Sequence, residues 1–370
     1  MKKILVWLIA LVLIFAIVGI VLMYTADKPP VDEIENNRIA LAEAEKMNAE
    51  IYSHSLYSEA KAKYDSAMAL WKKENERFIF LRRFDSVRMM AVKSAELARM
   101  AVDKAKEVQN NTRKEVQEEI VKLRQEMKDF EKMFVSLPLN QKIISQHSRG
   151  KLLLNEAEIA FEKGDYNAGR IKSRDAASLI RTAYRSGRQM LQDYFKDLPL
   201  WQEQLKKAIQ ASEKDYVIVV QKIPAACEIY YKGKKKYSFP AEFGKNWLGP
   251  KRFEGDYATP EGEYRIIKRL QSPMTRYYKA LLLDYPNSAD RARIEKLKKS
   301  GSIPKNARPG SLIEIHGEGG RGANWTNGCA ALSNEDMSVL FRYADKGTLV
   351  VIIGASESLD HVNHVEEVEN

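Results

Sequence analysis

The sequence predicts an α+β multidomain protein with an N-terminal transmembrane helix, an α-helical hairpin or bundle region, and a C-terminal mostly-β domain. Three observations lead to this prediction. Residues 4–23 carry no charge, a long stretch after them lacks glycine and proline, and strand-like runs begin near residue 215. The 370 residues are 45% hydrophobic and 30% charged, which is a globular composition long enough for more than one domain.

The first segment is an uncharged run over residues 4–23 that follows Lys2 and Lys3. About 18 apolar residues or more are enough to span a bilayer as a helix, and basic residues before the run predict a cytoplasmic N-terminus. We therefore expect a membrane anchor over residues 1–26 in the inner membrane. The protein would be single-pass in the cell membrane, with its remainder in the periplasm or extracytoplasmic space. The alternative is a cleaved signal peptide, whose apolar core is normally shorter.

The second segment, residues 31–212, has a helical pattern. Alanine and large apolar residues recur three or four positions apart, without glycine between Gly19 and Gly150. A loose internal repeat relates residues 84–101 to residues 166–183. Together these features predict an α-helical stalk or bundle. Generic amphipathic helices are one interpretation, and a surface for a protein partner is the other.

The third segment, residues 215–355, changes to short apolar runs separated by glycine and proline, which is typical of strands. Residues 356–370 form an acidic tail, and His361 and His364 within it lack the further ligands of a metal site. The expected strands are residues 216–220, 228–231, 264–267, 280–283, 312–315 and 348–353.

The net charge and the two cysteines limit which partners and functions we expect. The formal net charge is +10, which in an exported protein suits an anionic envelope or a membrane surface. Nucleic acid is not an expected partner outside the cytoplasm. The two cysteines, Cys227 and Cys329, could form one disulfide, whereas a catalytic thiol must stay free. The G-x-G-x-x-G spacing at residues 317–322 is not followed by a helix, so it does not predict a dinucleotide site.

The segment over residues 312–341 contains the candidate chemistry. A strand is expected to end at His316, a glycine-rich loop follows, and Cys329 comes before a capped helix. The thiolate is the attacking form of cysteine, and an imidazole can take the thiol proton and later return it to a leaving amine. The amides of Gly328 and Cys329 are candidate oxyanion donors. The carbonyl of Gly317 is a candidate acceptor for the second nitrogen of His316.

This segment resembles the signature of the L,D-transpeptidase (YkuD-like) catalytic domain, in which His-Gly and a variable loop precede Ser/Thr-x-Gly-Cys. Here the second part is residues 326–329, Thr-Asn-Gly-Cys. Upstream, residues 255–266 (GDYATPEGEYRI) are similar to a second family stretch, and the resemblance covers residues 215–354. It implies Cys329 as nucleophile, His316 as base and the Gly317 carbonyl as orienting group.

The resemblance also implies a peptidoglycan stem peptide as substrate and a thioester on Cys329, without a metal or organic cofactor. An acceptor amine would turn the thioester into a cross-link, and water would hydrolyse it. Asn327 stands where many members have His, and Ala331 stands where many have Arg. The residues after Cys329 instead resemble a branch that includes murein-cleaving enzymes.

Three functions therefore stay open: a transpeptidase of cell-wall biogenesis, a murein hydrolase (L,D-carboxypeptidase, endopeptidase or amidase), and a membrane-anchored murein-binding scaffold. Candidate substrate-binding residues lie beside the cysteine and in a region where family members carry a flap. Arg276 or Arg321 is a candidate replacement for the missing Arg. The substrate-binding candidates are Arg276, Tyr278, Trp325, Thr326 and Asn327.

Overall fold

A computed structural model describes residues 2–25 and 27–359. The chain divides into two compact units: Met1–Gln125 with Leu152–Ala177, and Glu126–Lys151 with Ser178–Asn370. The predicted domain limits at residues 31–212 and 215–355 stay predictions. His361, His364 and most of the predicted acidic tail lie outside the described residues.

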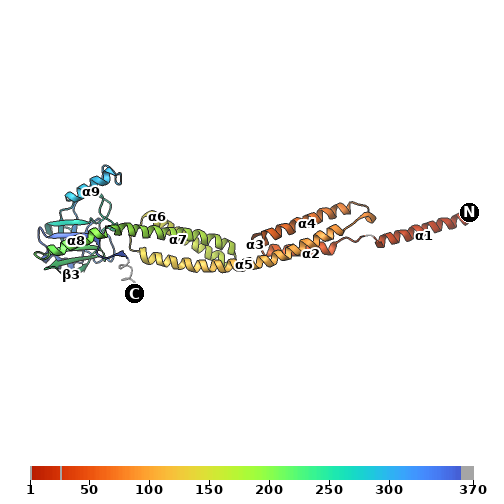
Figure 1. The fold of residues 1–370 in the computed structure, drawn as a ribbon, viewed down its shortest axis with the longest axis horizontal. Coiled ribbons are helices and arrows are strands. Elements are labelled where there is room, and N and C mark those ends of the chain that lie inside the picture. The colour runs from red at the N-terminus through yellow and green to blue at the C-terminus, as the bar shows by residue number, and fades with distance from the viewer. Residues whose placement is uncertain (1, 26, 360–370) are drawn as a thin grey trace. The chain divides into compact units, whose positions relative to one another are not determined.

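The first unit is helical. Small residues let its helices approach closely, because Ala44, Ala60 and Ala98 are all fully buried in one cluster. Ser94 closes the same interface, since its hydroxyl donates to the carbonyl of Ala60 at 2.6 Å. Figure 1 shows α2 and α4 alongside the first half of α5. Its elements are α1 (Lys2–Thr25), α2 (Val31–Lys46), α3 (Ala49–Tyr52), α4 (His54–Asn75), η1 (Ile79–Leu81), the start of α5 (Asp85–Phe134), the end of α6 (Gln141–Glu162) and the start of α7 (Tyr166–Tyr194).

The N-terminal helix requires a correction of the predicted fold class. Across residues 2–25 and 27–359, the structure contains no helix whose length and apolar character together suffice to cross a membrane. We therefore correct four predictions as wrong: the transmembrane helix at residues 4–23, the anchor at residues 1–26, the inner-membrane partner and the single-pass location. The fold is a mixed helical and sheet protein with a C-terminal curled sheet.

The second unit contains the end of α5 and parts of two further long helices, α6 (Gln141–Glu162) and α7 (Tyr166–Tyr194). Phe130, Phe134 and Leu191 are buried together in a small core between these helices. The chain then continues through η2 (Phe195–Asp197) and α8 (Leu198–Ala211). The expected long helices are therefore present, and they precede the sheet.

The sheet has eight strands in the order β3-β2-β1-β8-β4-β5-β6-β7. The six predicted strands are confirmed, with shifted ends. The sequence missed two strands, β3 because six of its seven positions are exposed and it begins with three lysines, and β7 because it has two residues. The strands are β1 (Val217–Ile223), β2 (Ala226–Tyr231), β3 (Lys234–Pro240), β4 (Gly262–Gln271), β5 (Lys279–Leu283), β6 (Glu314–His316), β7 (Ala330–Ala331) and β8 (Leu349–Ala355).

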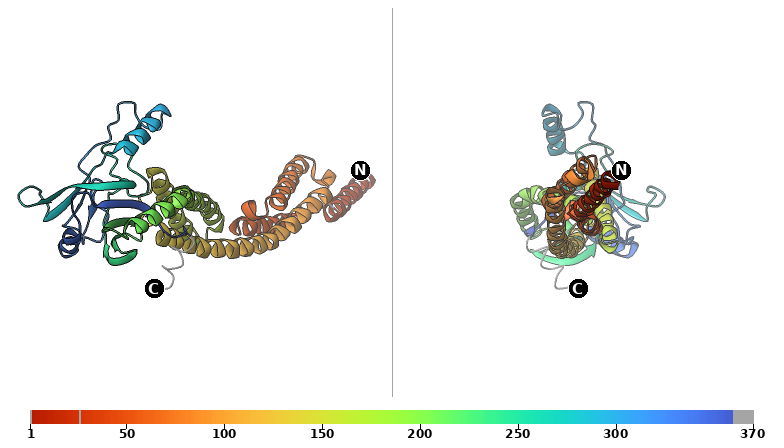
Figure 2. Two further views of the ribbon diagram at one scale, coloured as in Figure 1. Left: turned by 60° about the vertical axis from the view of Figure 1, so that its left-hand side comes forward. Right: turned by 90° about the vertical axis from the view of Figure 1, so that its right-hand side faces the viewer.

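Helix α8 packs against β1 and β8 through a buried cluster that includes Trp201, Val219 and Ile353 (Figures 1 and 2). The contact depends on a glycine: a Cβ at Gly354 would lie 2.3 Å from the indole of Trp201. Two further helices belong to this unit, α9 (Ser288–Lys299) and α10 (Asn334–Tyr343). The predicted cap of α10 is confirmed, because the Ser333 hydroxyl accepts from the amide of Asp336 at 3.1 Å.

Candidate active site

Two short strands place the candidate catalytic pair. In the parallel ladder between β6 and β7, Ile315 pairs with Ala330 and His316 pairs with Ala331. The carbonyl of His316 also accepts from the amide of Leu332 at 2.9 Å. Since Cys329 directly precedes Ala330, the ladder places it beside β6, the strand that ends with His316. The glycine-rich loop between β6 and β7 therefore brings the chain back alongside β6.

His316 is fully buried, and its tautomer follows from its partner. Its Nδ1 lies 2.6 Å from the carbonyl of Gly317, the group proposed from the sequence. A carbonyl only accepts hydrogen bonds, so Nδ1 carries the proton and Nε2 keeps a lone pair. Among the described residues Nε2 has no hydrogen-bond partner. The ring therefore presents a free basic nitrogen.

The surroundings of His316 keep the ring neutral. Burial lowers its pKa to about 4, against the opposing effect of the hydrogen bond to Gly317. The charges of Arg276 and Arg321 lower the same pKa further. The imidazole is therefore uncharged at neutral pH and able to accept a proton, as a general base must be.

Cys329 is also neutral at rest. Burial raises the pKa of its thiol to about 11, while a hydrogen bond from the amide of Glu314 and the charge of Arg276 act in the opposite direction. Its Sγ lies 3.7 Å from the carbonyl of Leu312, to which the thiol donates. The thiolate, which is the reactive form, must therefore be generated by proton transfer rather than being present beforehand.

The loop before the cysteine is held by its own hydrogen bonds. The amide of Gly328, one of the two candidate oxyanion donors, donates to the hydroxyl of Thr326 at 3.1 Å. That hydroxyl donates to the carbonyl of Cys329 at 2.8 Å. Gly328 has a φ of +132°, and a Cβ there would lie 2.8 Å from the carbonyl oxygen of Ala258. Thr326 is buried, and both of these hydroxyl contacts lie within the loop itself.

The upstream motif, residues 255–266, packs under this loop. The hydroxyl of Thr259 accepts from the amide of Gly244 at 3.0 Å and lies 3.4 Å from the carbonyl of Cys329. Buried Lys222 donates to the carbonyl of Thr259 at 2.6 Å and to the carboxylate of Glu261 at 2.8 Å. Sequence reasoning missed Lys222, because it lies on β1 within an apolar run and its partner is 39 positions away.

Two aromatic rings enclose the imidazole. Tyr277 stacks on His316, with ring centroids 3.6 Å apart and planes 8° apart. Trp325 contacts the same ring edge-on, at 5.9 Å and 71°. Buried Glu242 holds Trp325, because its carboxylate accepts from the indole Nε1 at 2.8 Å and from the amide of Gly322 at 2.7 Å. Neither Tyr277 nor Glu242 was among the predicted site residues, and only Tyr277 had a local signal, its position beside Arg276.

The other substrate-binding candidates are exposed to solvent. Tyr278 is 44% exposed, and its hydroxyl accepts from Ser338 at 3.0 Å. Asn327 is exposed. Arg276 and Arg321 are exposed as well, each stacked on one of the two aromatic rings beside His316. Trp325 thus contacts His316, and the charge of Arg276 acts on both His316 and Cys329, whereas Tyr278 and Asn327 are exposed and stay candidates.

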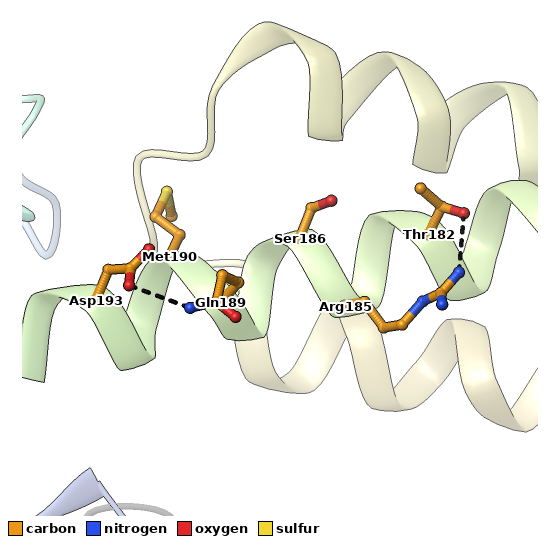
Figure 3. Close-up of a pocket in the computed structure, with 6 residues that line it drawn as sticks. All are labelled: Thr182, Arg185, Ser186, Gln189, Met190 and Asp193. Atoms are coloured by element: carbon orange, nitrogen blue, oxygen red, sulfur yellow. Dashed lines mark hydrogen bonds between the residues drawn. The ribbon is translucent and has the colours of Figure 1, made fainter.

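A separate depression lies on α7, away from these residues. Figure 3 shows its side chains along one helix, with Arg185 donating to Thr182 at 3.4 Å and Gln189 donating to Asp193 at 3.1 Å. It contains no residue of the candidate site. Within residues 2–25 and 27–359, no group of three or more His, Cys, Asp or Glu side chains could hold a metal ion.

Comparisons with known proteins agree with the motifs. Residues 215–352 match the YkuD family, described as the L,D-transpeptidase catalytic domain. The chain is 32% identical over 103 residues to the putative L,D-transpeptidase YafK of Escherichia coli K12, a match over 28% of this chain and 34% of the relative. The chain thus spans about a third of the length of the curated relatives it matches.

Solved structures also match. Bd1075 of Bdellovibrio bacteriovorus is 24% identical with a TM-score of 0.29, covering 42% of this chain and 54% of that chain. An L,D-transpeptidase from Mycobacterium smegmatis is 13% identical with a TM-score of 0.26, covering 38% of this chain and 59% of that chain. The family match includes His316 and Cys329 and confirms the resemblance: residues 215–352 are an L,D-transpeptidase (YkuD) catalytic domain.

Proposed function

We propose that this chain is a peptidoglycan-remodelling cysteine acyltransferase of the L,D-transpeptidase type, acting on murein stem peptides through a thioester on Cys329. The single observation that carries the proposal is the state of His316. Its Nδ1 proton is held by the carbonyl of Gly317, and its Nε2 lone pair is unpartnered among the described residues. That nitrogen is available to take the thiol proton, as nucleophilic catalysis requires.

The cycle starts from a neutral pair. When the scissile carbonyl reaches Cys329, the thiol proton moves to Nε2 of His316 and the sulfur attacks the carbonyl carbon. The resulting oxyanion needs backbone donors. The amide of Gly328 can serve only if it leaves the hydroxyl of Thr326, which it contacts at 3.1 Å. The C–N bond then breaks, and the imidazolium returns its proton to the leaving amine. An acceptor amine attacks the thioester carbonyl, the C–S bond breaks, and the proton of the amine passes through His316 to the departing thiol of Cys329.

Hydrolysis of the same thioester is the second candidate. It is favoured by the position that holds Arg in many family members, which is Ala331 here. Ala331 is fully buried, and its backbone pairs with Glu242 at 2.8 and 2.9 Å. Position 331 therefore supplies no guanidinium to the site, and hydrolysis stays the second candidate outcome.

The test is incubation of the full chain with defined muropeptides followed by mass analysis. A directly cross-linked dimer supports transfer, and a monomer shortened by one residue supports hydrolysis. Cys329→Ser should abolish both products, whereas Cys227→Ala, which alters the other, fully buried thiol, should leave them. Circular dichroism of both variants controls for folding. Full activity of Cys329→Ser would exclude the proposed mechanism.

A further inference from the structure

One buried lysine of the catalytic domain has no role in the proposed cycle. The side chain of Lys222, on β1, has no exposed area. Its Nζ donates to the carbonyls of Gly249 and Thr259 at 2.7 and 2.6 Å and to the carboxylate of Glu261 at 2.8 Å. Burial lowers the pKa of Lys222, and the charge of Glu261 opposes that effect. A neutral amine has two protons and an ammonium has three, so three acceptors require the charged form.

The surroundings of Lys222 limit what it can do. The hydroxyl of Tyr194, at the end of α7, donates to the same carboxylate oxygen of Glu261 at 3.1 Å. Tyr194 and Glu261 are buried as well. A lysine enclosed in this way cannot touch a substrate, so any effect on catalysis must pass through the groups that it holds.

One of those groups leads to the candidate nucleophile. Lys222 holds the carbonyl of Thr259, and the hydroxyl of Thr259 donates to the carbonyl of Cys329 at 3.4 Å. The hydroxyl of Thr326 donates to the same carbonyl at 2.8 Å. The Cys329 peptide is therefore held both from within its own loop and from a segment 70 positions away.

The two segments are also in direct backbone contact. A Cβ at Gly328 would lie 2.8 Å from the carbonyl oxygen of Ala258, so the two backbones meet where a side chain would not fit. A shift of residues 258–259 would therefore move the nucleophile loop with it. A misplacement of about 1 Å can cost about 100-fold in rate, because the reacting atoms no longer meet in the productive geometry.

We propose that Lys222 is a positioning residue for Cys329. Its ammonium fixes residues 259–261, and Thr259 transmits that position to the peptide of the nucleophile. This inference rests on the proposed function. The alternative is that Lys222 only neutralises the buried carboxylate of Glu261, which is a role in stability alone.

Paired substitution separates these two roles. Lys222→Met removes the donor to Thr259 and leaves Glu261 without its cation, whereas adding Glu261→Leu removes the carboxylate and does not restore the donor. We expect kcat for a synthetic stem peptide to fall about 10- to 100-fold in both variants, with KM changed less than about twofold. The melting temperature should fall in the single variant and recover in the double variant. A double variant that regains both wild-type stability and wild-type kcat would overturn the positioning role.

Two variants of Thr259 test the last link without removing either charge. Thr259→Val removes the hydroxyl and keeps the carbonyl that Lys222 holds, whereas Thr259→Ser keeps both. Thr259→Val should lower kcat with KM unchanged, and Thr259→Ser should retain most of the wild-type kcat. Equal kcat in the wild type and in Thr259→Val would overturn the link to Cys329.

The matched control is Lys235→Met, which also leaves a buried carboxylate without its cation. Lys235, on β3, pairs with buried Glu228 of β2 at 2.8 Å, and this carboxylate also accepts from Gln221 and Tyr230. The control should keep the wild-type kcat. A loss as large as that in Lys222→Met would show a general effect of an unpaired buried charge and would overturn the positioning role.

The same samples separate this inference from the function on which it rests. Intact mass after mixing with the peptide reports acylation of Cys329. Acylation at equal rates in the wild type and in both Lys222 variants refutes the positioning role alone. Absence of acylation in the wild type refutes the proposed function together with the positioning role.

Discussion

The protonation state of Cys329 gives a quantitative prediction about its reactivity towards an alkylating agent as the pH is raised. Burial raises the pKa of this thiol to about 11, from a usual value of 9.0. Only the thiolate reacts, so at pH 7 about one molecule in ten thousand is reactive, compared with about one in a hundred for an ordinary thiol. Alkylation of Cys329 should therefore be about 100-fold slower than that of a free cysteine peptide, and should rise tenfold per pH unit.

The size of the two pKa shifts also decides whether Cys329 and His316 rest as a neutral pair or as a thiolate–imidazolium ion pair. The pKa values of about 11 for Cys329 and about 4 for His316 are seven units apart, which opposes proton transfer by about 9 kcal/mol. Even at a separation of about 4 Å, attraction between two opposite charges would return only about 4 kcal/mol at an effective dielectric constant of about 20. The neutral pair therefore stays favoured.

The assay is the rate of iodoacetamide labelling from pH 6 to pH 11, read by mass spectrometry of the peptide that contains Cys329. Fully buried Cys227 is an internal control, and it should stay unlabelled until the chain is denatured. A labelling rate that levels off below pH 7 would show a thiolate–imidazolium pair in the free enzyme. That result would refute the reasoning from burial.

Three further predictions concern stability. His316 has a pKa of about 4 in the folded chain, against a usual 6.5. The stability that it contributes is therefore present above pH 6.5 and is lost as the pH falls through 4, by about 3 kcal/mol. Urea unfolding at both pH values should show this loss in the wild type and not in His316→Gln. Gly354→Ala should cost about 1–3 kcal/mol, because its Cβ would clash with Trp201; an unchanged melting temperature would contradict that packing. Lys222→Met should cost about 3–5 kcal/mol by leaving the buried carboxylate of Glu261 without its cation. Adding Glu261→Leu should recover much of this loss, and no recovery would contradict the ion-pair explanation.

Much of the catalytic domain follows from local sequence. Six strands are predictable because β-branched and aromatic residues cluster between turns, as at Val217–Ile223 and Leu349–Ala355. The end of β6 at His316 and the capped helix after Cys329 are also local features. A short motif predicts both features, because residues that are neighbours in the chain determine where the strand ends and how the helix is capped.

The rest depends on pairs that are distant in the chain. Glu242 acts on a loop 80 positions away, and Lys222 is buried only because Glu261 and two carbonyls surround it. Tyr277 could be placed on His316 only by knowing that β5 pairs with β6, which aligns Ala280 with His316. The prediction of a membrane span came from residue type alone, and the described helices do not bear it out.

The central claim is that Cys329 forms a thioester with a stem peptide after passing its proton to His316. Rapid mixing of the full chain with a synthetic stem peptide, followed by an acid quench and intact mass spectrometry, tests it most directly. We predict an adduct of the acyl fragment on Cys329 that hydroxylamine removes, strongly reduced in His316→Gln and absent in Cys329→Ser. Turnover of the peptide without any adduct, or an adduct that persists in Cys329→Ser, would contradict the claim.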